Sequence, residues 1–152
     1  MQDNLARMVF REVIRPPLWV LGFIYFMFLS LVIAIWAALD NRSALISWIA
    51  ATVGIIAIAI HWRTEITLDD KELRVGAAHI EIKYLKEVTA LRGEDMRRMR
   101  TRDADPAAFL SLAFWIPTGV KVVLNDDRDS VPYWLISVRK SEELTRTLYR
   151  LL

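Results

Sequence analysis

Residues 18–39 read LWVLGFIYFMFLSLVIAIWAAL, and this run without a charged side chain decides the fold. At the ~1.5 Å rise per residue of an α-helix it is about 33 Å long, enough to cross the ~30 Å hydrocarbon core of a bilayer. A second run, residues 44–62, reads ALISWIAATVGIIAIAIHW and is about 28 Å long in the same conformation. We therefore predict transmembrane helices over 18–39 and 44–62, which together form a helical hairpin over 18–62.

A cleaved signal peptide is the alternative interpretation of the first run. The apolar region of a signal peptide is typically ~7–15 residues long and ends at a cleavage site of small residues. Ala37 and Ala38 resemble such a site only weakly, and a second apolar run follows at once. The pattern favours a membrane anchor.

The flanking charges predict the topology of the hairpin. Three arginines precede the first span and Arg63 follows the second, whereas the connection 40–43 contains only Arg42. Cytoplasmic flanks of membrane helices carry an excess of Lys and Arg. Both termini are therefore expected in the cytoplasm.

Small residues recur along both spans and suggest how the hairpin packs. Small residues allow helix backbones to approach closely in lipid. Folding the chain about residues 41 and 42 brings Ala34 near Ala50 and Ser30 near Gly54. We assign the stripes to packing between the spans, with an oligomer contact or no special role as alternatives. The stripes are Ser30, Ala34 and Ala37 in the first span, and Ala50, Gly54 and Ala57 in the second.

After residue 62 the apolar residues alternate with polar ones, and most of the 20 Lys and Arg and the 18 Asp and Glu lie in this part. Alternation over 66–68 and 73–75, with an acidic turn between them, predicts a β-hairpin. Further strands are expected over 79–88, 120–124 and 131–138. The pattern predicts a small antiparallel sheet within a domain over 63–152, and residues 1–17 form a separate N-terminal segment.

An amphipathic helix is expected to close the sheet at the C-terminus. Ser141 is a typical N-cap residue, two glutamates follow it, and Leu144, Leu148 and Leu151 share one helix face.

Several short motifs carry a resemblance to a known family. They are Arg11-Glu12, Pro16-Pro17, the stretch LRVG over 73–76, and a Pro-Tyr-Trp-x-x-Ser-x-Arg pattern over 132–139. In this order, with the two spans between them, they resemble a family of small actinobacterial membrane proteins of unknown function. The resemblance implies a bacterial cytoplasmic membrane protein with a pleckstrin-homology-like (PH-like) cytoplasmic domain. The expected fold class is thus a membrane α-hairpin plus an α+β domain, with a PH-like antiparallel sheet and a C-terminal amphipathic helix.

Composition excludes several kinds of chemistry. With no Cys and two His, the chain lacks disulfides, thiolate metal sites and cysteine nucleophiles. The net charge of +2 argues against nucleic-acid binding despite the pI of about 9.1. Asp126, Asp127 and Asp129 offer carboxylates for Mg²⁺ or Ca²⁺, but they lack the Gly and terminal Glu of an EF-hand loop, so a hairpin turn is favoured. We predict no catalytic residues, no metal site and no cofactor.

Two features suggest binding. Arg97, Arg98, Arg100 and Arg102 precede an apolar stretch over 109–115, and such a cluster at an anionic membrane surface attracts lipid headgroups. The alternative is a solvated charged loop followed by a short core helix. Trp134 lies in a strand with apolar residues on both faces, and we expect it to be buried, with an exposed docking residue as the alternative.

These observations predict a non-enzymatic, membrane-anchored PH-like module that docks a protein partner or a lipid headgroup at the cytoplasmic face. The alternative is an accessory subunit of a larger membrane complex, and an enzyme is the third interpretation. The expected partners are the lipid bilayer and a protein in or at the membrane, with no nucleic acid. The sequence specifies neither the partner's identity nor the oligomeric state.

Overall fold

The computed structural model describes residues 8–125 and 130–152, and the chain divides into two compact units. One unit, the helical unit, spans Arg15–Arg63. The other, the β unit, combines the chain up to Ile14 with Thr64–Leu152. The chain therefore leaves the β unit, forms the helical unit and returns.

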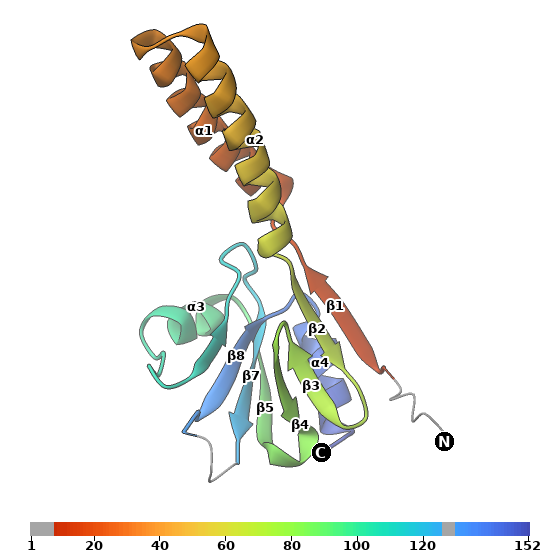
Figure 1. The fold of residues 1–152 in the computed structure, drawn as a ribbon. Coiled ribbons are helices and arrows are strands. Elements are labelled where there is room, and N and C mark those ends of the chain that lie inside the picture. The colour runs from red at the N-terminus through yellow and green to blue at the C-terminus, as the bar shows by residue number, and fades with distance from the viewer. Residues whose placement is uncertain (1–7, 126–129) are drawn as a thin grey trace, which may run out of the picture. The chain divides into compact units, whose positions relative to one another are not determined.

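The helical unit consists of α1 (Leu18–Ala38) and α2 (Asn41–His61), which run antiparallel side by side (Figure 1). Both helices are long and apolar enough to cross a membrane, with mean hydropathies of 2.5 and 2.2. Almost none of their apolar windows is buried, whereas a core helix of a soluble protein would be mostly covered. The predicted pair of long apolar helices is confirmed.

The connection between the helices is shorter than predicted because Asp40 caps α2. Its carboxylate accepts a hydrogen bond from the backbone N–H of Ser43 at 2.9 Å. Hydrogen bonds from the Ser43 side chain and then its backbone lower the pKa of Asp40. This N-cap starts α2 at Asn41, inside the expected connection.

Contacts between α1 and α2 differ from the expected stripes. The Tyr25 hydroxyl accepts a hydrogen bond from Trp48 Nε1 at 3.1 Å and lies 3.4 Å from Thr52 Oγ1. A Cβ atom at Gly54 would lie 3.7 Å from the Phe28 ring. Large side chains of α1 therefore meet smaller residues of α2, because a bulky ring fills the space that a small residue leaves. Five of the six predicted stripe residues are instead exposed, namely Ser30, Ala34, Ala37, Ala50 and Ala57.

The β unit contains two four-stranded sheets (Figure 1). The first is antiparallel, in the order β1 (Phe10–Ile14), β2 (Thr64–Leu68), β3 (Glu72–Val75) and β4 (Ala78–Glu81). The second has the order β5 (Leu85–Leu91), β7 (Gly119–Leu124), β8 (Tyr133–Ser137) and β6 (Phe109–Ser111). A 3₁₀ turn, η1 (Ile82–Tyr84), precedes β5, and the unit also contains the helices α3 (Gly93–Thr101) and α4 (Ser141–Tyr149).

An antiparallel sheet followed by a C-terminal helix is thus confirmed, and several details are corrected. The strands form two sheets, and β6 pairs with β8 in parallel. The predicted strand 79–88 is divided by η1, and the arginine cluster lies on α3 instead of in a loop. The apolar stretch after it, expected as a short helix, begins with the strand β6.

The N-terminal segment 1–17, expected to stand apart from the later domain, contributes a strand to it. All five residues of β1 pair with β2, from Phe10↔Leu68 to Ile14↔Thr64. Phe10 and Ile14 are buried in the core. Burial of these two side chains explains why so short a segment adopts a defined strand.

The core lies where α4 covers the second sheet. Leu144 and Leu148 of α4 are fully buried, and α4 contacts β5 and β7. Lys140 occupies the N-cap position, so α4 begins with Ser141 instead of being capped by it. On the second sheet, a Cβ atom at Gly119 would lie 2.6 Å from both the Ile136 carbonyl oxygen and the Met96 methyl group, so glycine lets α3 pack closely there.

Replacing Trp134 by Ala should destabilise the protein. Trp134 is 6% exposed, and its ring centroid lies 4.5 Å from that of Phe109. Loss of this buried ring is expected to lower the free energy of unfolding by about 3–5 kcal/mol, because transfer energy is lost and a cavity remains. Denaturant unfolding of the full chain in detergent measures this, since a fragment starting at residue 63 would lack β1. Tyr149→Ala, at an exposed position of α4, is the matched control, and equal midpoints and slopes for the two variants would contradict the burial of Trp134.

Candidate functional site

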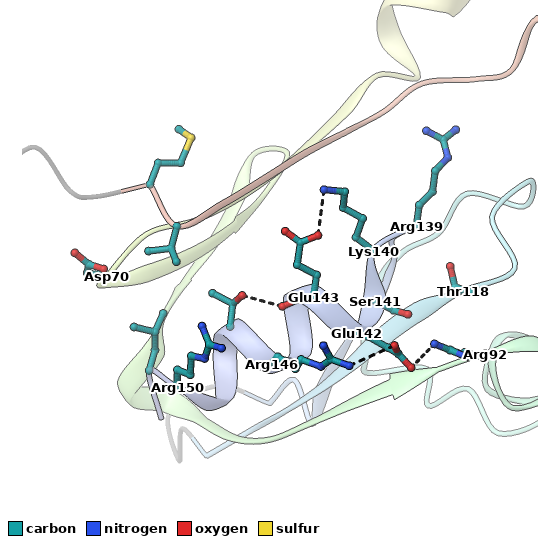
Figure 2. Close-up of a pocket in the computed structure, with 14 residues that line it drawn as sticks. Asp70, Arg92, Thr118, Arg139, Lys140, Ser141, Glu142, Glu143, Arg146 and Arg150 are labelled. Atoms are coloured by element: carbon teal, nitrogen blue, oxygen red, sulfur yellow. Dashed lines mark hydrogen bonds and ion pairs between the residues drawn. The ribbon is translucent and has the colours of Figure 1, made fainter.

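A groove of about 1140 Å³ runs beside α4 in the β unit (Figure 2). The exposed face of α4 forms one wall, because Leu144 and Leu148 turn the opposite face into the core. Segments distant in sequence complete the lining: Met8 and Val9 before β1, Asp70 in the β2–β3 turn, Arg92 before α3 and Thr118 before β7. The groove is therefore a product of the tertiary fold.

The groove is rich in positive charge. Arg146 and Arg150 are one helical turn apart on α4, and both are exposed. Arg139 precedes the helix at its other end. Five cationic and three acidic side chains line the groove: Arg92, Arg139, Lys140, Arg146 and Arg150, against Asp70, Glu142 and Glu143.

Ion pairs satisfy some of these charges (Figure 2). Glu142 pairs with Arg92 and also lies 3.8 Å from Arg146, while Lys140 Nζ lies 3.1 Å from Glu143. These side chains are at least half exposed, so each pair contributes little to stability and can exchange for a ligand. Within residues 8–125 and 130–152, Arg139 and Arg150 have no carboxylate partner. The groove thus offers two cations at opposite ends of α4.

Glu12 on β1 holds the start of α4 in place. Its two carboxylate oxygens accept hydrogen bonds from the backbone N–H groups of Arg139 at 2.9 Å and Lys140 at 3.2 Å. Free N–H groups at a helix start need acceptors, and a carboxylate is favourable at this end of the helix dipole. The first strand of the chain therefore positions the basic end of the groove.

The motif over 132–139 has structural roles. The Tyr133 hydroxyl accepts a hydrogen bond from the backbone N–H of Asp105 at 2.8 Å. The Ser137 hydroxyl is buried and accepts a hydrogen bond from the Ala113 N–H at 3.0 Å. Trp134 belongs to the core, so its side chain is not presented for docking. The motif ties two loops to β8.

The structure divides the predicted arginine cluster instead of bringing it together as one site. Arg98 pairs with Glu94 at 2.8 Å on the same helix. Arg100 is partly buried and donates hydrogen bonds to carbonyl oxygens of the loop after β6. Arg97 and Arg102 are exposed. None of the four lines the groove beside α4.

Sequence reasoning missed the groove itself. The available signal was the spacing of Arg146 and Arg150 on the face of α4 opposite its leucines. The positions of Arg92, Arg139 and Asp70 around this face depend on contacts that the sequence pattern does not reveal. The acidic residues Asp126, Asp127 and Asp129 lie outside the described residues. In the part of the chain that is described, no three His, Asp or Glu side chains are grouped so that they could hold a metal ion.

Comparison with known proteins identifies a family. Residues 9–148 match the model of a family described as "Protein of unknown function (DUF3093)". This match covers most of the chain, so the protein belongs to that family. No curated protein and no solved structure matches the chain.

Glu12→Ala should destabilise the protein by about 1–2 kcal/mol, as expected for the loss of a helix cap. Glu12→Gln keeps one side-chain oxygen acceptor and should lose less. Thermal or denaturant unfolding of the full chain measures both variants. Glu87→Ala removes an exposed carboxylate on β5 and is expected to change stability by less than about 0.5 kcal/mol. A Glu12→Ala variant as stable as this control would contradict the proposed clamp.

Proposed function

We propose that this member of the DUF3093 family is a non-enzymatic, membrane-anchored binding module. In this proposal the helical unit crosses the bacterial cytoplasmic membrane, both termini lie in the cytoplasm, and the β unit docks a protein partner in the groove beside α4. The observation that carries the proposal is the pair of cations, Arg139 and Arg150, without a described carboxylate partner on a structurally fixed groove.

The spacing of these cations favours a protein segment as the ligand. Eleven residues separate them, and α4 occupies most of that interval, so they are roughly 15 Å apart along the helix axis. A single small anion cannot contact both ends at once, whereas an extended segment with spaced Asp or Glu residues can. The remaining groove carboxylates already pair with other cations, which leaves the positive charges at the two ends for the ligand.

Chain connectivity supports the membrane anchor. Ile14, where the chain leaves the β unit, pairs directly with Thr64, where it returns. The whole helical unit is therefore inserted between two neighbouring strands. Three residues connect β1 to α1 and two connect α2 to β2, and arginines in both linkers fit the cytoplasmic side of a membrane.

Two sheets followed by a C-terminal helix also support a PH-like assignment of the β unit. The strand β1 and the parallel β6–β8 pair are features that this assignment must accommodate. The actinobacterial affiliation of the family resemblance stays a prediction.

A second candidate function is that of an accessory subunit in a larger membrane complex. The observation that favours it is the exposure of the small residues Ser30, Ala34 and Ala37 on α1, and of Ala50 and Ala57 on α2. Such residues allow a further helix to approach closely in lipid. The two functions are compatible, because the helices and the groove present separate surfaces.

Single-cysteine labelling tests the topology. The chain has no Cys, so Ser43→Cys and Ser130→Cys each introduce a unique reporter. In intact cells a membrane-impermeant maleimide should label position 43 from outside and position 130 only after the cells are permeabilised. Labelling of both positions from outside would exclude the proposed anchor.

Site-specific crosslinking tests the groove. A photoreactive amino acid at Thr147, which lines the groove, should form a discrete adduct with one protein in native membranes. The charge reversals Arg139→Glu and Arg150→Glu should each reduce its yield strongly, because they repel an acidic segment. Lys86→Glu, an exposed cation on β5 outside the groove, is the control and should leave the yield unchanged. An adduct that survives both groove reversals would refute electrostatic docking here.

A further inference from the structure

A second surface of the β unit is apolar. The loop from Leu112 to Pro117, between β6 and β7, is called the apical loop here. Phe114 is 61% exposed, Leu112 is 39% exposed, and the adjacent Leu110 on β6 is 42% exposed. Large exposed apolar side chains concentrated in one segment of a small unit mark an interaction surface.

The apical loop is held rigidly, so this exposure is built into the fold. Arg100 of α3 donates hydrogen bonds to the carbonyl oxygens of Ala113 at 2.9 Å and Ile116 at 3.2 Å. The Ala113 N–H donates to the buried Ser137 hydroxyl, and the side chains of Ala113 and Ile116 are buried. Buried and exposed residues therefore alternate, and the anchored ones present Leu112 and Phe114 outward.

Contacts within the β unit place this loop at the edge where the chain departs for the helices. Thr118, the residue after the loop, exchanges hydrogen bonds with Val138 at 2.7 and 3.2 Å. The next residue, Arg139, donates its N–H to Glu12, which stands two residues before Ile14. At Ile14 the chain leaves for α1, and its pair Thr64 receives the chain from α2. A membrane crossed by these helices is thus within reach of the apical loop.

The surroundings of the loop match a membrane surface. Aromatic side chains are enriched where bilayers meet water, and Phe114 and Trp115 stack edge to face with centroids 4.8 Å apart. Arg97 and Arg102 are exposed on the same helix that anchors the loop through Arg100. Cations beside an apolar tip suit anionic lipid headgroups above an acyl region.

We infer that the apical loop inserts Leu112 and Phe114 into the bilayer interface and thereby seats the β unit on the membrane that the helices cross. The inference rests on the membrane anchor of the proposed function and adds a third, shallow point of attachment. Its occupant is lipid, not protein. Seating of this kind would restrict the orientations in which the groove beside α4 meets a partner.

Depth measurement by spin labelling tests the inference on the full-length chain. Leu112→Cys, carrying a nitroxide, is reconstituted in vesicles of equal parts phosphatidylcholine and phosphatidylglycerol. We expect the ratio of oxygen to aqueous nickel-chelate accessibility to be several times that of Asn125→Cys. Asn125 follows the opposite end of β7, roughly 20 Å from the loop along the strand, and is exposed, so it serves as the aqueous control.

A third label separates failure of this inference from failure of the membrane anchor. Ser30→Cys lies near the middle of α1 and should give a deep reading if the helices span the bilayer. A deep label at position 30 with an aqueous label at 112 would overturn the loop insertion alone, as expected if a protein covers the patch instead. An aqueous label at position 30 would overturn the anchor and the loop insertion together.

The charge of the lipid tests the role of the arginines. Arg97→Gln with Arg102→Gln should make the label at 112 shallower in the anionic vesicles and should have little effect in pure phosphatidylcholine. Because both side chains are exposed and without a described carboxylate partner, the double variant should keep the fold. An unchanged depth in anionic vesicles would remove the headgroup contact from the proposal.

Discussion

Pairing of β1 with β2 is the interaction on which the rest of the structure depends. These strands are neighbours in space, yet the complete helical unit separates them in sequence. A flexible connection of that length would cost entropy to close. Here α1 and α2 are antiparallel and equal in length at 21 residues, so their outer ends meet at one end of the hairpin. The helices thus favour the strand pairing, and the strand pairing fixes both helix ends to one domain.

This constraint extends from β1 into the rest of the β unit through Glu12. Its carboxylate binds the two N–H groups at the start of α4, which positions Arg139 at one end of the groove. Val138, one residue earlier, bonds to Thr118 at the end of the apical loop. The groove and the loop therefore share one rigid connection, and a partner in the groove and a membrane under the loop would act on the same frame.

Much of the fold follows from local patterns. The two apolar runs, the hairpin around Leu68 and Leu73 and the leucine face of α4 all depend on residues close together in sequence. The missed elements depend on distant ones. Phe10–Ile14 becomes a strand only beside β2, and the three residues of β6 pair with β8, more than 20 positions later. In α3, Met96 is the buried residue that docks a helix otherwise rich in arginine. Neither length nor periodicity identifies such segments.

The same division applies to the candidate sites. By itself the sequence determined that two helices long enough for a membrane precede a charged β domain, because helix length and apolar content are properties of contiguous residues. Only the tertiary structure decided which charges are available. Arg100 is engaged by loop carbonyls and Arg98 by Glu94, whereas Arg139 and Arg150 face a groove built from distant segments. Burial of Trp134 and exposure of Phe114 were decided in the same way. The physical reason is that charge pairing and burial depend on neighbours in space, and these neighbours come from parts of the chain far apart in sequence.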